Sequence, residues 1–227
     1  MAASRYALAL IAVGLILGKG GAQVKTAAAQ AQVENLLTLP PPQKSAGMSL
    51  TEAMARRRSV REFSPRALTR EQLGQLLWAA QGITSREGMR TAPSAGALYP
   101  IEIYVATANG LHHYQPRGHK LEPRASTDVR PALSRAALGQ SFIAQAAAVF
   151  VIAADYQRTA RKYGPDRTPR YVHLEAGHVA QNLLLQATAL GLGGVPVGAF
   201  IDEEVRSVVS LPPAEQAVYM VVVGYAR

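Results

Sequence analysis

Residues 171–200 read YVHLEAGHVAQNLLLQATALGLGGVPVGAF, and this stretch decides the fold. Its first part repeats apolar residues at helical spacing, from Val172 through Val179 to Leu190. The spacing predicts a helix over 170–190 that ends at Gly191. Because the apolar stripe is wide and rich in alanine, we expect a central helix packed closely against its neighbours. A short strand or loop is expected to follow at 193–199.

The segment after this helix carries four glycines, at 191, 193, 194 and 198. A helix end needs only one glycine, so the others require a second explanation. A backbone without side chains can press its amides against a flat aromatic ring system. The segment does not match the dinucleotide fingerprint, because no G-x-G-x-x-G opens a helix here.

The rest of the chain mixes helices and strands without regular alternation. Capping boxes at Ser49–Glu52 and Thr69–Gln72 predict a helix over Leu50–Arg58 and a second helix that Gly82 closes. Asp128 and Asp202 are expected to cap two more helices, the first continuing to about Leu138. Strands are expected at 101–107, 111–114, 146–153 and 217–223, the first two joined by Asn109-Gly110 and the third buried on both faces. This pattern predicts an α+β fold.

Composition limits the classes of protein to consider. With 227 residues, of which 48% are hydrophobic, the chain can bury one good core. It contains no cysteine, which excludes disulfides, thiolate catalysis and iron–sulfur clusters. The histidine spacings suit no metal pair, and neither H-E-x-x-H nor G-x-S-x-G occurs. We therefore expect no metal site and find little case for a hydrolase.

The N-terminus resembles an export signal. Arg5 precedes an apolar run from Tyr6 to Leu17, and small residues stand at Gly20 and Ala22, where a cleavage site would require them. We predict a signal peptide or anchor over 1–22 and an exported protein, periplasmic or membrane-anchored. A buried N-terminal helix is the alternative. Residues 23–44 end in Pro40-Pro41-Pro42 and are interpreted as a linker, with one domain over 45–227.

A dense basic run, RRRSVREF, occupies residues 56–63. Guanidinium groups bind phosphate in bidentate fashion, so the run is a candidate phosphate clamp. The alternative is a solvated helix C-terminus, where basic residues interact favourably with the helix dipole. The net charge of +9 is compatible with nucleic-acid binding. We do not expect that function, because this is the one dense basic run and no aromatic residues interleave with it.

A second candidate segment is PSAGALYP at residues 93–100. Its small residues would let a flat ligand approach the backbone closely, and Ser94 could donate to a carbonyl or ring nitrogen. The alternative is an ordinary loop that enters the strand at 101–107.

The four segments RRRSVREF, PSAGALYPIEIYV, residues 171–200 and the terminal VVVGYAR occur in an order that resembles the nitroreductase superfamily, and most closely its SagB/ThcOx-type dehydrogenase branch. The resemblance covers about residues 48–227. It implies an α+β homodimer with FMN at the dimer interface, each site using residues of both chains. By analogy, the FMN-binding positions are Arg57, Arg58, Ser59, Arg61, Pro93, Ser94, Ala95, Gly96, Pro196, Val197, Gly198, Ala199 and Arg227.

In azoline-oxidising members of this branch an adjacent Lys-Tyr pair is implicated in catalysis, and Lys162-Tyr163 fits that pattern. An exposed pair in a loop is the alternative interpretation. The resemblance implies an FMN-dependent oxidoreductase that transfers hydride between a reduced donor, with NAD(P)H as the candidate, and a small organic molecule. Two other functions stay open: a non-catalytic flavin-binding protein, and an azoline dehydrogenase acting on a modified peptide.

Overall fold

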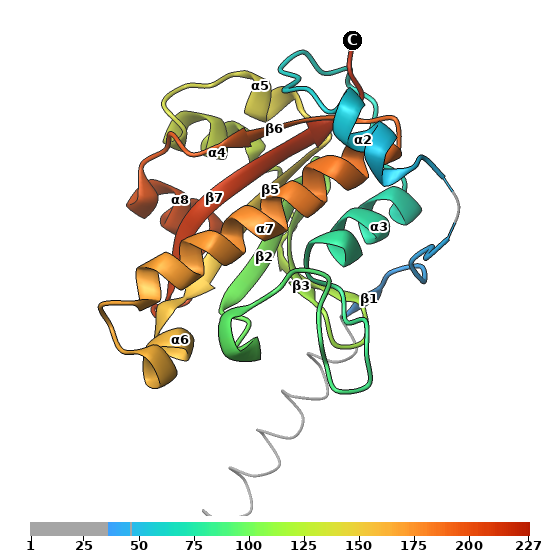
Figure 1. The fold of residues 1–227 in the computed structure, drawn as a ribbon. Coiled ribbons are helices and arrows are strands. Elements are labelled where there is room, and N and C mark those ends of the chain that lie inside the picture. The colour runs from blue at the N-terminus through green and yellow to red at the C-terminus, as the bar shows by residue number, and fades with distance from the viewer. Residues whose placement is uncertain (1–35, 46) are drawn as a thin grey trace, which may run out of the picture. The chain divides into compact units, whose positions relative to one another are not determined.

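The computed structural model describes residues 36–45 and 47–227, and the compact unit begins at Leu37 (Figure 1). The proposed export segment and most of the linker therefore lie outside the described residues. The end of that linker belongs to the domain, since strand β1 (Leu37–Thr38) pairs with β4 (Lys120–Ala125) and Leu39 is buried. The domain thus starts earlier than the Ser45 expected from the sequence.

The sheet has seven antiparallel strands in the order β1-β4-β3-β2-β5-β7-β6. The strands not yet introduced are β2 (Ile101–Thr107), β3 (Gly110–Gln115), β5 (Ala148–Asp155), β6 (Gly193–Val197) and β7 (Glu215–Gly224). Residues of β5 alternate between two cores, with Phe150 and Ile152 in one and Val149 and Val151 in the other. Burial of this strand on both faces is confirmed.

Helices cover both faces of the sheet, and the predicted α+β fold is confirmed. One face packs against α3 (Arg70–Gln81) and the long helix α7 (Thr168–Ala189), which bury Leu77 and Val179 respectively. The other face packs against α4 (Arg130–Ala136), α5 (Phe142–Gln145) and α8 (Asp202–Val209). Within the described ranges, no helix is both long enough and apolar enough to cross a membrane.

Several boundaries differ from the sequence-based predictions. Helix α2 (Leu50–Arg56) stops short of Arg58, because Arg57 takes an extended ψ of 125°. Helix α4 ends at Ala136 rather than near Leu138, which has a positive φ of 58°. The residues expected to cap α4 and α8, Asp128 and Asp202, are not the N-caps, which are Val129 and Ile201. Asp128 still accepts a hydrogen bond from the Arg130 amide at 3.0 Å.

The elements that were not predicted include β1, β4, α5 and the helix α6 (Tyr156–Tyr163). The N-cap of α6, Asp155, accepts hydrogen bonds from the amides of Gln157 and Arg158.

Candidate active site

The basic run lies directly against the glycine-rich strand β6. After α2 ends, Ser59 forms a parallel bridge with Gly194, and the Val60 amide donates to the Gly194 carbonyl at 3.1 Å. The approach is close, because a Cβ on Gly193 would lie 2.8 Å from Cβ of Val60. Two segments far apart in the sequence therefore meet along the edge strand of the sheet.

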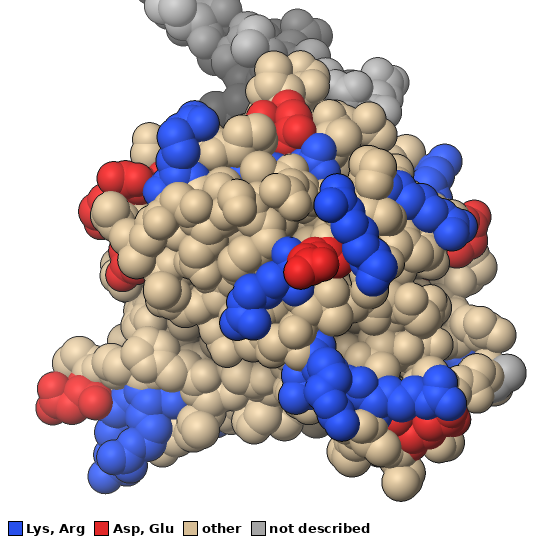
Figure 2. Space-filling model, turned by 90° about the horizontal axis from the view of Figure 1, so that it is seen from above, with Lys and Arg blue, Asp and Glu red and all other residues tan. Residues whose placement is uncertain are grey.

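The C-terminus joins the same assembly. The Ser64 amide donates to the Tyr225 carbonyl at 2.8 Å, and the Arg227 amide donates to the Glu62 carbonyl at 3.1 Å. Arg227 is therefore placed beside the basic run. Figure 2 views the molecule from the end at which α2 and the C-terminus lie in Figure 1, and basic side chains are prominent over this face.

The arginines of the run differ in their contacts. Arg58 folds back on α2, its Nη1 donating to the carbonyls of Ala55 at 2.9 Å and Arg57 at 2.7 Å. It thus stabilises the helix C-terminus, as the alternative interpretation of the run expected. Arg57 and Arg61 form no salt bridge with any carboxylate of the described residues. Their charges are available to an anion.

The predicted ring-contacting segment, Pro196–Ala199, follows at the other end of β6. Gly198 and Ala199 are exposed, and a Cβ on Gly198 would have Tyr219 as its nearest neighbour at 3.8 Å. Close packing accounts for Gly193 and Gly194, and a positive φ of 71° accounts for Gly191. Gly198 is thus the one glycine of the four for which neither close packing nor a positive φ accounts, and its backbone is open to a ligand.

Two residues that the sequence analysis missed contact these segments. The Gln140 side chain donates to the Ala199 carbonyl at 3.0 Å, and the Phe142 ring centroid lies 5.9 Å from Cζ of Arg61. Both belong to the turn into α5, which is a short helix without a motif that would have marked it.

The segment Pro93–Gly96 belongs to a strained loop. Ala97 and Tyr99 have positive φ values of 54° and 49°. Non-glycine residues in this region cost about 1–3 kcal/mol each and persist only where their surroundings hold them. Ser94 Oγ accepts the Tyr99 amide proton at 2.8 Å, so this serine stabilises its own loop. The Tyr99 carbonyl accepts from Arg158 at 2.7 Å, and its hydroxyl accepts from the Arg90 amide at 3.1 Å.

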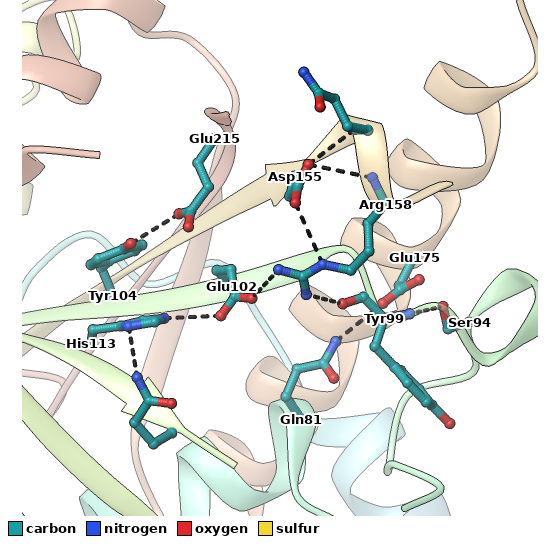
Figure 3. A network of polar contacts seen from close by, with 12 residues as sticks. Gln81, Ser94, Tyr99, Glu102, Tyr104, His113, Asp155, Arg158, Glu175 and Glu215 are labelled. Carbon is teal, nitrogen blue, oxygen red and sulfur yellow. Dashed lines mark hydrogen bonds and ion pairs between the residues drawn. The ribbon is translucent and has the colours of Figure 1, made fainter. Parts of the chain in front are cut away.

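A network of buried and partly buried polar groups lies behind this loop (Figure 3). Glu102 bonds Arg158 at 2.8 Å and His113 at 2.9 Å. Burial opposes ionisation of Glu102, but these bonds outweigh it and lower the pKa of this carboxyl. Burial raises the pKa of Glu175, and hydrogen bonds from Ser94 and Gln81 only partly offset this effect. Two carboxyls therefore lie behind the loop: Glu102, whose ionised form is favoured, and Glu175, whose ionised form is disfavoured.

Lys162 and Tyr163 occupy the last turn of α6 rather than a loop. A Cβ on Gly96 would lie 2.8 Å from Lys162 Nζ and 2.9 Å from Tyr163 Oη. The Tyr163 ring packs against Tyr171, with centroids 4.7 Å apart. The proposed catalytic pair therefore lies directly over the segment expected to line a flavin.

The predicted site residues form two groups in one chain. The first group, around Ser59 and Gly194, lies just beyond the C-terminal end of α7, whereas Lys162 and Gly96 lie near its N-terminal end (Figure 1). Because α7 has 22 residues, the groups are separated by about 33 Å of helix. A single chain does not bring all the predicted residues together.

A sequence model of the Nitroreductase family matches residues 54–225. The chain belongs to the nitroreductase family. A candidate nitroreductase of Methanocaldococcus jannaschii is 47% identical over 170 residues, which are 72% of this chain and 85% of the relative. A crystal structure of a candidate nitroreductase from Ralstonia eutropha has a TM-score of 0.78 at 33% identity, covering 85% of this chain and 90% of that one. The trifolitoxin-processing protein TfxB of Rhizobium leguminosarum is 31% identical over 135 residues, or 55% of this chain and 36% of the relative.

The geometry of this nitroreductase-family chain fits the two ends of FMN. A phosphate requires cations that no carboxylate neutralises, and among the described residues Arg57 and Arg61 are two such cations. A flat ring requires open backbone, which is found at Gly198 and beside the small residues at 94–96. In the described part of the chain, no group of three His, Asp or Glu side chains is placed to hold a metal ion.

Proposed function

We propose that this nitroreductase-family oxidoreductase depends on FMN and transfers hydride between a nicotinamide donor and a small organic substrate. Proteins of the family generally use flavin. The observation that carries the proposal is the meeting of the basic run and Arg227 with β6, at whose other end the backbone of Gly198 is open. When bound, FMN supplies the two-electron chemistry, and the chain supplies binding and orientation.

In this proposal each segment has a distinct role. Arg57, Arg61 and Arg227 hold the phosphate, with Ser59 beside them. Arg58 supports the run through its bonds to the α2 carbonyls. The backbone of Pro196–Ala199 lies along one side of the ring, where the amides of the exposed residues Gly198 and Ala199 can donate to it.

The remaining segment, Pro93–Gly96, requires a second subunit. Because the two groups of residues lie near opposite ends of α7, one copy cannot enclose a flavin with both. A two-fold axis beside α7 would bring the first group of each chain to the second group of its partner. The exposed face of α7 includes Leu174, of which 55% is accessible, and such an apolar side chain favours a homodimer interface.

The test is flavin binding by the full chain. We expect protein reconstituted with FMN to retain it through gel filtration, and the double variant Arg57→Ala/Arg61→Ala to bind FMN at least about tenfold more weakly. The matched control is Arg124→Ala/Arg135→Ala, which removes two arginines from β4 and α4 and should leave binding unchanged. Wild-type protein that takes up no FMN would refute the proposal. Protein that binds FMN but accepts no electrons from NADH or NADPH would instead be a non-catalytic flavin-binding protein.

A second candidate function is azoline oxidation on a modified peptide. The position of Lys162 and Tyr163 over Gly96 favours it, because a lysine beside the flavin could remove a proton while hydride leaves. The test is oxidation of a thiazoline-containing peptide by FMN-loaded protein, compared with reduction of a nitroaromatic compound. Lys162→Ala should abolish the first reaction if this candidate is correct.

We retain export as a proposal, on the basis of Arg5 and the apolar run to Leu17 alone. Fractionation of the producing cells and intact mass of the recovered protein test it. Cytosolic protein that retains residues 1–22 would contradict it.

A further inference from the structure

A cavity of about 610 Å³ lies apart from every residue assigned to the flavin. Its walls come from the segment Pro41–Lys44, the end of α3, the loop over 83–88 and the turn between β3 and β4. The volume is in the range of sites that bind small molecules. Because the proline segment forms one wall, residues expected to be a linker instead shape this cavity.

The charges at this cavity all have one sign. Lys44, Arg86 and Arg117 line it, and no carboxylate does. All three cations are exposed, and none forms a salt bridge with a described residue. His119 also lines the cavity, but burial lowers its pKa, so its ring is neutral at pH 7. The charge of the lining is therefore complementary to an anion.

The rest of the lining is largely apolar. Trp78, Ile83 and Tyr114 contribute side chains, and Pro41, Pro42 and Pro116 contribute rings. The Tyr114 hydroxyl is already bonded to Nδ1 of His119 at 2.8 Å. The Trp78 indole nitrogen and Nε2 of His119 are both buried and have no hydrogen-bond partner in the described residues, so neither is counted as a contact for a ligand. A largely apolar lining with aromatic residues, together with three cations that form no salt bridge in the described residues, suits an amphipathic ligand.

We propose that this cavity is a second binding site, which takes a flat organic anion. The aromatic body would lie against Trp78 and the proline rings, and its carboxylate or sulfonate would lie among Lys44, Arg86 and Arg117. This site does not depend on the proposed flavin chemistry, because its residues and those of the flavin site do not overlap.

Trp78 provides the measurement, because it is the single tryptophan of the chain. We use 8-anilinonaphthalene-1-sulfonate as the probe and follow energy transfer from Trp78 during titration of the full-length protein. We expect saturable binding that the variant Arg86→Ala/Arg117→Ala weakens by about tenfold, since it removes two of the three cations that line the cavity. The control variant Arg124→Ala/Arg135→Ala should bind as wild type does.

Two further comparisons make the result decisive. The uncharged analogue N-phenyl-1-naphthylamine should bind more weakly and should be insensitive to the loss of Arg86 and Arg117. Saturating FMN should leave the affinity for the sulfonate unchanged, which separates this site from the flavin site. Equal binding by wild type and Arg86→Ala/Arg117→Ala, or displacement of the probe by FMN, would overturn the proposal.

Discussion

At Gly96, two constraints act on a single residue. Its φ is +61°, and a Cβ would come within 3.0 Å of both Lys162 Nζ and Tyr163 Oη. We expect Gly96→Ala to lose about 1–2 kcal/mol of folding stability from the left-handed backbone. Because Tyr163 is packed against Tyr171, we also expect the pair to be displaced and kcat of FMN-loaded protein to fall by about tenfold or more.

The matched control is Gly139→Ala. Gly139 has a φ of +75° but nothing within 4 Å of its Cβ position. This variant should lose similar stability in urea unfolding and keep its kcat. Equal kcat values for the two variants would show that the Lys162–Tyr163 contact has no part in turnover.

Glu102 and Glu175, the two carboxyls behind the loop at Pro93–Gly96, should make the folding stability depend on pH in opposite directions. The pKa of Glu102 is lowered in the folded chain. Its ionised carboxylate therefore stabilises the fold above the ordinary carboxyl pKa, and this stabilisation is lost as the pH falls through the pKa of the folded state. We expect Glu102→Gln to cost about 2 kcal/mol at neutral pH, through its bonds to Arg158 and His113, and less in acid.

For Glu175 the pH dependence of folding stability has the opposite sign. The pKa of Glu175 is raised in the folded chain. Its protonated carboxyl therefore contributes to folding stability below the ordinary carboxyl pKa, and this contribution is lost as the pH rises through the pKa of the folded state. Glu175→Gln should therefore gain stability relative to wild type as pH rises. Urea unfolding of both variants from about pH 4 to about pH 8 tests this. Parallel pH profiles for the two variants would contradict the assignment.

At the scale of elements, the contact between the basic run and β6 depends on Gly193. A Cβ there would lie 2.8–2.9 Å from three side-chain carbons of Val60, which is β-branched and stiff. We expect Gly193→Ala to cost about 1–3 kcal/mol and to weaken FMN binding, because the run is pushed away from the strand. Adding Val60→Ala should restore part of both losses. A double-mutant cycle in urea measures the coupling, and strict additivity would contradict this account.

The elements that the sequence predicted correctly carry their own signals. The spacing of Val172 and Val179 marks α7, and the capping box at Thr69 is present in the structure. Strand β4 lacks such a signal, because it contains Pro123 and several charges and is a strand through its pairing with β3. Helix α6 is mostly polar, although Asp155 before it and Gly164 after it could have marked its ends.

For the whole molecule, the sequence identified the segments of the candidate site but not their arrangement. Excess glycine near 193 was interpreted as a surface for a ring, whereas the structure uses Gly193 and Gly194 for contacts with Val60 and Leu184. The contact between Gly193 and Val60 joins residues more than a hundred positions apart, which local patterns do not encode. The contact of Gln140 with Ala199 was missed for the same reason.

The separation of the two groups of site residues leads to a prediction about assembly. Leu174 is 55% exposed on α7, and Leu138 is 65% exposed beyond α4, in the helical layer on the opposite face of the sheet. If two copies meet along α7, Leu174→Asp should convert a dimer to a monomer in analytical ultracentrifugation and should reduce FMN content in parallel, since each site loses its partner loop. Leu138→Asp should change neither. Both side chains are exposed, so the folding stability of the monomer should change by less than about 0.5 kcal/mol. A Leu174→Asp protein that stays dimeric, or a monomer that keeps its flavin, would show that the site does not use two subunits in this way.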